Sequence, residues 1–353
     1  MKKVMIGMSG GVDSSVAAAL LQQQGYEVIG VTMRLWTYSD SCTHEGCCAE
    51  SAVEDARRVC DKLGIEFYVM NLKELFREKV VDYFVDEYCR GRTPNPCIAC
   101  NRYLKFDAMY KRAMAMGMDY VATGHYAKIE KNEQTGRYSL RMSDAAQKDQ
   151  SYVLYNFTQE QLAHTLMPLG SYTKPEVREL AEKLGLSVAN KPDSQEICFV
   201  ENGDYAEFIR EYADYEPREG DILDVKGNVI GTHKGLIYYT IGQRKGIGAY
   251  GRPMFVMKMD AENNTITLGD KGMEFSEGLI AEDVNFISID KLTEPMEVSV
   301  KVRYQAKPTP AVIRPAEDGR VEVVFGQPQR AVTPGQAVVF YDGDEVVGGG
   351  CVV

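Results

Sequence analysis

A strand–loop–helix stretch near the N-terminus constrains the fold more than any other part of the chain. The apolar run Lys3–Met8 leads into Ser-Gly-Gly-Val-Asp-Ser at residues 9–14, and an Ala/Leu-rich helix is expected over Ser14–Gln24. Two adjacent glycines let backbone N–H groups turn inward, and the start of a helix adds partial positive charge. The loop therefore predicts a phosphate site, although a capping turn built from the same Ser and Asp is the structural alternative.

The loop differs from two common nucleotide-binding loops. It lacks the lysine of the G-K-[S/T] motif, which excludes a Walker A loop. It also lacks the G-x-G-x-x-G spacing of dinucleotide-binding folds, and no acidic residue is suitably placed for a ribose hydroxyl. A different class of nucleotide-binding enzyme is therefore indicated.

Strand and helix patterns alternate over the first two hundred residues. Further strands are expected at Tyr26–Leu35, Ile65–Leu72 and Tyr120–Thr123, and further helices at Ser51–Leu63, about Lys73–Tyr88, Arg102–Met116 and Lys174–Leu184. Strands separated by helices imply an α/β domain in which a parallel sheet has helices on both faces.

The pattern changes after about Asp204. Helical periodicity disappears, glycines multiply, and short alternating strands continue to the C-terminus. Regularly spaced short strands with turn residues between them indicate small barrels. We therefore predict an α/β domain over residues 1–204, a small mainly-β module over 205–277, and a second one, a β-barrel, over 278–353.

Basic residues are concentrated in three stretches of a chain that is acidic overall. The net charge is −11, yet residues 89–106, 225–259 and 301–314 contain Lys and Arg without any Asp or Glu. One such stretch alone would be interpreted as a solvated loop. Three together indicate a polyanion that docks in a defined place.

The N-terminal sequence and the cysteine content bear on location. The first apolar stretch is broken by glycines, and no apolar run reaches the length of a membrane span. We therefore expect a cytoplasmic protein without a membrane partner. In that compartment the nine cysteines should be mostly reduced, so those in use should be catalytic or metal-binding.

Two cysteines stand three residues apart in the segment Thr-Pro-Asn-Pro-Cys97-Ile-Ala-Cys100. Such a pair can be half of a zinc site, a redox pair, two iron–sulfur ligands, or a coincidence of composition. The spacing alone leaves these four alternatives open.

The other cysteines are less informative. Cys42, His44, Cys47 and Cys48 have the composition of a metal site, but adjacent cysteines are poor geometry for one tetrahedral ion, which disfavours zinc there. Three further cysteines lie on predicted helices or a terminal strand and are expected to be packing residues: Cys60, Cys89 and Cys351.

The glycine loop resembles that of enzymes that split ATP into AMP and pyrophosphate to activate a carbonyl oxygen. Further segments, in order along the whole chain, resemble one family among them, the bacterial tRNA-specific 2-thiouridylases. The matching segments are GRTPNP before Cys100, ATGHY at 122–126, KDQSYVLY at 148–155, SQEICF at 194–199, GLIYYTIGQRKG at 235–246, VRYQ at 302–305 and AVTPGQAVVFY at 331–341.

This resemblance implies an adenine nucleotide α-hydrolase-like fold and ATP-dependent thiolation of the wobble uridine of tRNA at C2. Oxide is a very poor leaving group, so ATP would first adenylate the C2 oxygen, and a protein persulfide would then attack C2. A second thiolate must cleave the S–S bond. The resemblance places the persulfide on Cys198 and the second thiol on Cys100, with sulfur supplied by a cysteine desulfurase or a relay protein.

The resemblance also implies the residues that contact ATP and tRNA. ATP, with Mg²⁺, would be bound by Gly7, Met8, Ser9, Gly10, Gly11, Val12, Asp13, Ser14, Met33 and Gly124, with Asp13 near the metal and pyrophosphate. For Met33 alone, core packing would be the ordinary interpretation. The tRNA anticodon loop would be contacted by Asn95, Pro96, Cys97, His125, Lys148, Asp149, Gln150, Arg303, Tyr304 and Gln336, of which residues 95–97 would meet the target base. An isolated histidine such as His125 would more often be structural.

The sequence departs from the family at Cys97, where many members have an aspartate that serves as a general base. A thiolate could accept the proton if its pKa is lowered, and Arg and Lys residues lie close in sequence. Alternatively, Cys97, Cys100 and Cys198 could hold an iron–sulfur cluster with an open position for sulfide. Two other functions remain possible for the whole protein. One is a ligating enzyme with the same ATP loop. The other is a non-catalytic tRNA-binding module, and the intact ATP loop argues against it.

Overall fold

The computed structural model describes residues 1–36, 50–192, 197–200 and 203–353. These residues form two compact units. Unit 1 consists of Met1–Val80, Cys97–Phe199 and Asp344–Val346, and unit 2 consists of Val81–Pro96, Val200–Gly343 and Val347–Val353. The linear division at residues 204 and 277 stays a prediction.

Unit 1 is built on a five-stranded parallel sheet in the order β3-β2-β1-β4-β7. Its strands are β1 (Lys3–Gly7), β2 (Glu27–Arg34), β3 (Glu66–Asn71), β4 (Tyr120–Ala122) and β7 (Thr165–Leu166). The predicted α/β fold with a parallel sheet is thereby confirmed. The short β7 at the edge was not predicted, because two residues give no periodicity.

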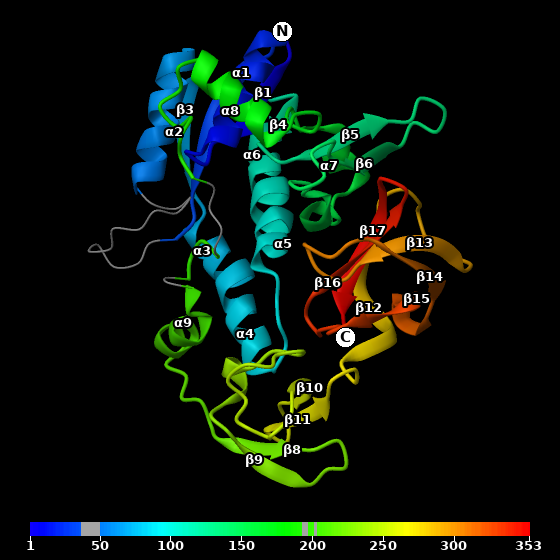
Figure 1. Ribbon diagram of the computed structural model, residues 1–353. Coiled ribbons are helices and arrows are strands. Elements are labelled where there is room, and N and C mark those ends of the chain that lie inside the picture. The colour runs from blue at the N-terminus through cyan, green and yellow to red at the C-terminus, as the bar shows by residue number, and fades with distance from the viewer. Residues whose placement is uncertain (37–49, 193–196, 201–202) are drawn as a thin grey trace. The chain divides into compact units, whose positions relative to one another are not determined.

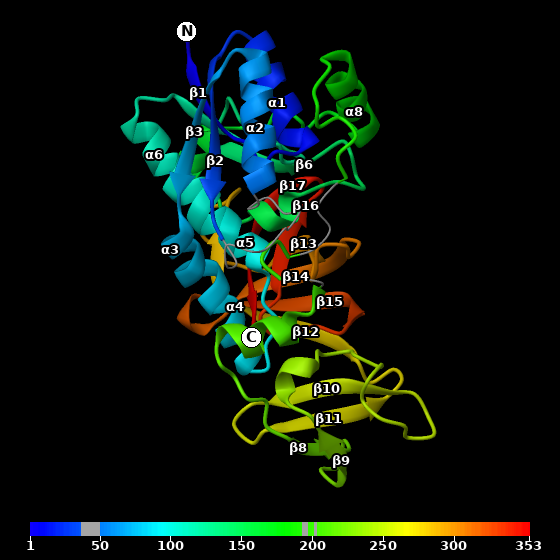
Figure 2. The ribbon, with the colours of Figure 1, turned by 90° about the vertical axis from the view of Figure 1, so that its left-hand side faces the viewer.

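Helices cover both faces of this sheet. On one face, α1 (Val12–Gln23), α2 (Glu50–Leu63) and α8 (Lys174–Lys183) contribute to a core that includes Val4 and Ile6 of β1. On the other face, α6 (Met109–Ala115) packs against Met5 and the apolar side chains of β2 (Figure 2). The small alanine side chains of α1 are almost fully buried, which lets this helix lie close to the sheet.

Two long helices contain π-helical segments. The first runs through α3 (Lys73–Phe76), a π segment (Arg77–Asp82) and α4 (Tyr83–Cys89), as the sequence predicted for about Lys73–Tyr88. The second runs through α5 (Pro96–Cys100), a π segment (Asn101–Ala108) and α6. It begins six residues before the predicted Arg102, because Pro96 has the fixed φ that suits the first position of a helix.

Shorter elements complete unit 1. A hairpin is formed by β5 (Ala127–Lys131) and β6 (Tyr138–Met142), followed by a 3-10 turn, η3 (Ser151–Leu154), and by α7 (Gln159–Ala163). Thr158 and Gln161 form a capping box at the start of α7.

Unit 2 contains one helix that the sequence analysis missed. The prediction that helices end after Asp204 is wrong, because α9 (Tyr205–Tyr212) begins there, with the Asp204 side chain accepting a hydrogen bond from Glu207 N at 2.9 Å. Its Phe208 packs near Phe84 of α4. Eight residues make only two turns, too few for the periodicity to stand out.

The middle of unit 2 is a four-stranded sheet in the order β10-β11-β8-β9. The strands are β8 (Gly220–Leu223), β9 (Val229–His233), β10 (Met254–Asp260) and β11 (Thr265–Asp270), with a 3-10 turn, η5 (Leu236–Tyr238), between β9 and β10. Ile222, Val256 and Leu268 lie in the core of this sheet. The predicted mainly-β character of this region is confirmed.

The C-terminal strands close into a six-stranded barrel, drawn from yellow (β12) through orange to red in Figure 1. The strands are β12 (Phe275–Phe286), β13 (Met296–Lys301), β14 (Thr309–Pro315), β15 (Val321–Arg330), β16 (Ala337–Asp342) and β17 (Glu345–Val352), with a 3-10 turn, η6, at Glu317–Gly319. β12 pairs with both β15 and β17, which closes the ring. Alternate side chains such as Val298, Ile313 and Val323 fill the interior, confirming the predicted barrel.

Among the helices of the described residues, none combines the length and the apolar character that a membrane crossing requires.

Candidate nucleotide and sulfur-transfer site

The glycine loop leaves the sheet at the carboxyl end of β1 and leads directly into α1. Ser14 Oγ accepts a hydrogen bond from Ser9 N at 3.1 Å and donates to Gly11 O at 3.3 Å, and Ser15 Oγ donates to Gly11 O at 2.8 Å. These bonds fix the curvature of the loop from within. Ligands of open α/β sheets bind at this edge, beyond the carboxyl ends of the strands.

Close backbone approaches explain two of the glycines. Gly10 has φ of +70°, and a Cβ there would lie 2.3 Å from Ala52 O of α2. A Cβ on Gly124, after β4, would lie 2.7 Å from Ser14 N. Any larger residue at either position would push the loop away from α2 or separate Gly124 from α1, so both glycines are needed for the shape of the loop.

Asp13 is the acidic side chain of the loop, and two residues from distant elements hold it. Lys174 Nζ lies 2.8 Å from each of its carboxylate oxygens, and Tyr126 Oη donates to Oδ1 at 2.7 Å. The sequence analysis did not single out Lys174 or Tyr126. Lys174 begins a predicted helix and Tyr126 ends the segment ATGHY, but their contacts with Asp13 arise only from the tertiary fold.

A second lysine ties the loop to α2. Lys191 Nζ lies 3.1 Å from Gly10 O and 2.8 Å from Asp55 Oδ2. Asp55 stands one turn along α2 from Ala52, so two adjacent turns of this helix support the loop. Lys191 too was missed by the sequence analysis.

The remaining predicted ATP residues differ in what they can offer a nucleotide. Met8 and Val12 have buried side chains that belong to the core, so only their backbone is available to a nucleotide. Met33 is half-buried at the end of β2 and packs against the core on the α6 face of the sheet. Gly7 ends β1 beside the loop.

The three predicted sulfur-chemistry cysteines lie in unit 1. Cys97 and Cys100 stand one turn apart on α5, and residues at this spacing share one helix face. Cys97 is exposed and Cys100 is half-buried. Cys198 is exposed and follows residues outside the described part of the chain.

A metal centre on these cysteines finds no support in the geometry. Within the described residues, no three His, Cys, Asp or Glu side chains are close enough together to hold a metal ion. Cys97, Cys100 and Cys198 are not brought together as such a group among these residues. The Cys42–Cys48 stretch lies outside the described residues.

The other cysteines differ in their surroundings. Cys60 is fully buried under the sheet, and burial raises the pKa of its thiol to about 12, as expected for a packing residue. Cys89 is half-buried at the end of α4. Cys351 is half-buried but accepts a 3.6 Å hydrogen bond from Arg92 Nη2, so the prediction that it serves only in packing is incomplete.

Several residues predicted to contact tRNA make hydrogen bonds within the protein. The His125 ring is buried and pairs through Nδ1 with Thr123 Oγ1 at 2.7 Å, and burial holds its pKa well below the usual value. The buried Asp149 accepts from Ser151 Oγ at 2.8 Å, and Gln150 Oε1 accepts from Tyr126 N at 2.9 Å. Lys148 is half-buried. Contacts of these residues with tRNA stay predictions.

The predicted tRNA residues of the barrel differ in their exposure to solvent. Arg303 and Tyr304 lie exposed after β13, and Lys301 Nζ lies 5.8 Å from the centre of the Tyr304 ring. An exposed arginine beside an aromatic ring suits stacking and phosphate contacts. Gln336 is half-buried and hydrogen-bonds to Thr93 O at 2.8 Å, just before the half-buried Asn95 and the buried Pro96.

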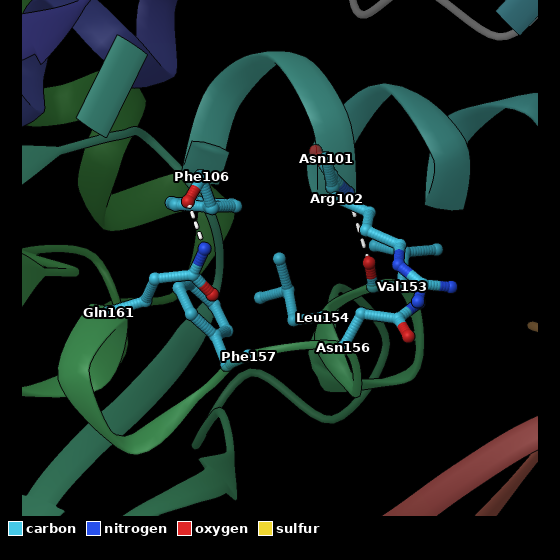
Figure 3. A pocket seen from close by; sticks show the side chains of 8 residues that line it. All are labelled: Asn101, Arg102, Phe106, Val153, Leu154, Asn156, Phe157 and Gln161. Atoms are coloured by element: carbon cyan, nitrogen blue, oxygen red, sulfur yellow. Dashed lines mark hydrogen bonds between the residues drawn. The ribbon is translucent and has the colours of Figure 1, made fainter. Parts of the chain in front are cut away.

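A small cavity of about 10 Å³ lies between the π segment Asn101–Ala108 and the stretch that follows from η3 to α7 (Figure 3). It is lined by Asn101, Arg102, Phe106, Val153, Leu154, Asn156, Phe157 and Gln161. Asn101 Oδ1 and both amide atoms of Asn156 are buried without a hydrogen-bond partner among the described residues. In a small cavity such atoms are commonly satisfied by ordered water.

Comparison with known families matches nearly the whole chain. Residues 2–202 match the tRNA methyl transferase HUP domain, residues 206–270 the tRNA methyl transferase PRC-barrel domain, and residues 276–352 the aminomethyltransferase beta-barrel domain.

Curated relatives are similar over their full length. The chain is 61% identical to the tRNA-specific 2-thiouridylase MnmA of Clostridioides difficile, covering 99% of this chain and 98% of that protein. It is also 61% identical to the tRNA-specific 2-thiouridylase MnmA of Acetivibrio thermocellus, covering 99% of each. A solved 4-thiouridine synthetase–RNA complex with bound ATP shares 21% identity at a TM-score of 0.37, covering 60% of this chain and 50% of that one.

Proposed function

Because the chain belongs to the tRNA-specific 2-thiouridylase family and is a tRNA sulfurtransferase, we propose that it replaces the C2 oxygen of the wobble uridine with sulfur in an ATP-dependent reaction. The observation that carries this proposal is the glycine loop at the carboxyl end of β1, on a chain similar to these enzymes over 99% of its length. Such a loop suits ATP as a substrate, because the phosphate oxygens of ATP can accept hydrogen bonds from the inward-facing backbone N–H groups of the loop.

The first step is adenylation. The C2 oxygen of uracil attacks the α-phosphate of ATP, pyrophosphate leaves, and the oxygen becomes part of a good leaving group, AMP. The loop backbone binds the phosphates. Lys174 would supply positive charge beside them, and Asp13 would offer a carboxylate oxygen to the Mg²⁺ of bound ATP. Tyr126 holds that carboxylate in one orientation through its 2.7 Å hydrogen bond.

The second step transfers sulfur. The terminal sulfur of a Cys198 persulfide attacks C2, and the C2–O bond breaks with release of AMP. The Cys100 thiolate then attacks the Cys198 sulfur, which breaks the S–S bond and leaves 2-thiouridine. The two cysteines become a disulfide, so their oxidation balances reduction of the sulfane sulfur. A cellular dithiol reductant restores both thiols, and a cysteine desulfurase or relay protein supplies the next sulfur in the cytoplasm.

Cys97 would act at the target base. Its exposure at the start of α5, beside Asn95 and Pro96, suits a residue that accepts a proton during the reaction. The alternative of an iron–sulfur cluster on Cys97, Cys100 and Cys198 has no supporting geometry among the described residues.

The tRNA would be held mainly through its backbone. Arg303 and Tyr304 on the barrel, together with Lys148 in unit 1, offer cationic and aromatic groups at or near the surface. The target base must leave the anticodon stack to reach the cysteines, as in other enzymes that modify bases.

The proposal is tested by comparing Cys198→Ala and Cys100→Ala with wild type in single turnovers with ATP, unmodified tRNA and a persulfide-donor protein. We expect AMP and 2-thiouridine to form in equal amounts with wild type, and 2-thiouridine to be lost with both variants. Cys89→Ala, on α4, is the control and should retain both products. If Cys198→Ala instead forms both products at the wild-type rate, the protein is another ligating enzyme with the same ATP loop.

A further inference from the structure

The turn between β15 and β16 contacts the chain segment that leads into α5. We call residues 333–336 the docking turn and residues 92–96 the approach segment; all of them belong to unit 2. Gln336 Nε2 of the docking turn donates to Thr93 O at 2.8 Å and to Pro94 O at 3.4 Å. One side-chain amide therefore reaches two successive carbonyls of the approach segment.

Backbone contacts reinforce this connection. Thr93 N donates to Pro334 O at 2.9 Å, so the two segments bond in both directions. Gly335 has φ of +89°, and a Cβ there would lie 3.0 Å from Thr93 N and 3.1 Å from Glu87 Oε2. The approach is so close that only a glycine fits without a shift of the backbone.

Both segments are themselves held firmly. Gly335 N donates to Val352 O at 2.9 Å, and Val352 N donates to Gln336 O at 2.8 Å, which pins the docking turn to β17. On the other side, Arg92 Nε pairs with the buried Glu87 at 2.8 Å, and Arg92 Nη2 lies 3.3 Å from Glu282 of β12. The approach segment is therefore fixed to the barrel at Arg92 as well as at Thr93.

We propose that Gln336 is a positioning residue for sulfur transfer: its amide fixes the approach segment and thereby sets where α5 begins, with Cys97 and Cys100 on it. The proposal rests on the function proposed above. Pro94 and Pro96 restrict the backbone between the fixed carbonyls and the helix, so displacement at Thr93 is transmitted to α5 rather than absorbed.

This role differs from the tRNA contact that the sequence predicts for Gln336. A residue that only binds tRNA would affect affinity and leave the tRNA-free protein unchanged. A residue that positions α5 would affect the protein before tRNA binds, and would lower the rate of thiolation after tRNA is saturating.

The experiment compares Gln336→Leu and Gln336→Glu with wild type. Leucine has a side chain of similar size to glutamine but no amide group. Glutamate keeps an acceptor oxygen but lacks the NH₂ donor. The control is Gln327→Leu, an exposed glutamine on β15 of the same barrel. Hydrogen–deuterium exchange of a peptide spanning residues 92–100, and the alkylation rates of Cys97 and Cys100, are measured by mass spectrometry without tRNA. Single-turnover thiolation is then measured at saturating tRNA.

We expect both Gln336 variants to exchange several-fold faster over residues 92–96 and to alter the alkylation rates of the two cysteines, while Gln327→Leu matches wild type. Thiolation at saturating tRNA should fall about tenfold, the scale of one lost hydrogen bond of this kind, with a change in the tRNA KM of less than about twofold. Loss of tRNA affinity with unchanged exchange, unchanged alkylation and unchanged maximal rate would overturn the proposal.

The two proposals fail in different ways. If the function is wrong, wild type gives no 2-thiouridine, yet the exchange and alkylation differences at residues 92–100 remain. If only the positioning role is wrong, wild type thiolates tRNA and the variants show wild-type exchange. Should Gln336→Leu not fold, Gln336→Glu, which preserves the shape of the side chain, carries the same measurements.

Discussion

The carboxylate of Asp13 is the centre of the polar contacts around the glycine loop. Motif comparison identified Asp13 itself, because the loop is contiguous in sequence. Its partners Tyr126 and Lys174 lie more than a hundred residues away and could not be predicted, since nothing local relates them to the loop. The same holds for Gln336 and Thr93, whose hydrogen bond joins residues 243 positions apart.

The substitution Tyr126→Phe tests the support of Asp13. Tyr126 is 2% exposed in the core, so phenylalanine keeps the packing and removes the phenol that donates to Asp13. We expect tRNA-dependent AMP formation to fall about tenfold, because a hydrogen bond to a charged group contributes roughly 1.5–3 kcal/mol. Tyr120→Phe, which removes a phenol bonded to Lys2 at the other end of β1, should keep the wild-type rate. Unaltered AMP formation in Tyr126→Phe would show that the phenol has no part in holding Asp13.

His125 makes a pH-dependent contribution to stability. Burial holds the pKa of the folded-state imidazole well below its usual value, and the nearby Lys105 acts in the same direction. The unfolded chain binds a proton below pH of about 6.5 while the folded protein does not, so this contribution is complete above that pH and declines below it, by at most about 1.4 kcal/mol per pH unit. The free energy of unfolding of His125→Asn should depend less on pH between 7 and 5 than that of wild type.

The free energy of unfolding of both proteins is measured by denaturant titration at several pH values between 7 and 5. If His125→Asn and wild type lose stability in parallel on acidification, the buried imidazole is not the cause.

Elements with strong periodicity were predictable, and short or irregular ones were not. The Ala/Leu helix after the loop and the four predicted strands of the parallel sheet, β1, β2, β3 and β4, lie within one or two residues of their predicted ends. The helix α9 was missed because eight residues give little periodicity. The helix predicted at Arg102–Met116 in fact starts earlier, at the cysteine-containing turn of α5, and that turn was therefore missed. The π segments in both long helices have no sequence signal that we recognise.

The connection between α2 and the glycine loop can be tested at Lys191. Replacement by methionine removes the ammonium group that joins Gly10 O to Asp55 while keeping most of the aliphatic side chain. We expect the KM for ATP to rise about tenfold, since a charged hydrogen bond of about 1.4 kcal/mol or more is lost. The measurement is AMP formation against ATP concentration at saturating tRNA.

Lys62→Met is the matched control, because Lys62 also joins α2 to a backbone carbonyl, that of Gly185, but stands two turns beyond Asp55. Its KM for ATP should equal that of wild type. An unchanged KM in Lys191→Met would mean that the loop keeps its shape without this lysine.

At the scale of the whole molecule, charge distribution distinguishes specific tRNA binding from general attraction to nucleic acid. The net charge is −11, so we expect tRNA to be drawn to the local acid-free stretches rather than to the protein as a whole. Their existence was visible in the sequence. Their arrangement across separate parts of the fold was not, because sequence distance does not give spatial distance.

Binding to tRNA should therefore weaken steeply with salt, and Arg303→Gln should reduce the slope of log Kd against log salt by about one, because one phosphate contact is lost. Titrations at four or more salt concentrations measure this slope. Arg320→Gln removes the same charge from the same barrel, but Arg320 pairs with Asp318 at 3.4 Å and should leave the slope unchanged. Equal slopes for wild type and Arg303→Gln would exclude a phosphate contact at Arg303.

The most direct test of ATP-dependent sulfur transfer by cysteine persulfide is an anaerobic reconstitution with iron-free protein. Protein, ATP, Mg²⁺, unmodified tRNA and a persulfide donor are combined, and AMP and 2-thiouridine are quantified by mass spectrometry. We predict that both products form in equal amounts without iron, and that omission of ATP abolishes both. Formation of 2-thiouridine only after an iron–sulfur cluster has been restored, or without conversion of ATP to AMP, would contradict the mechanism.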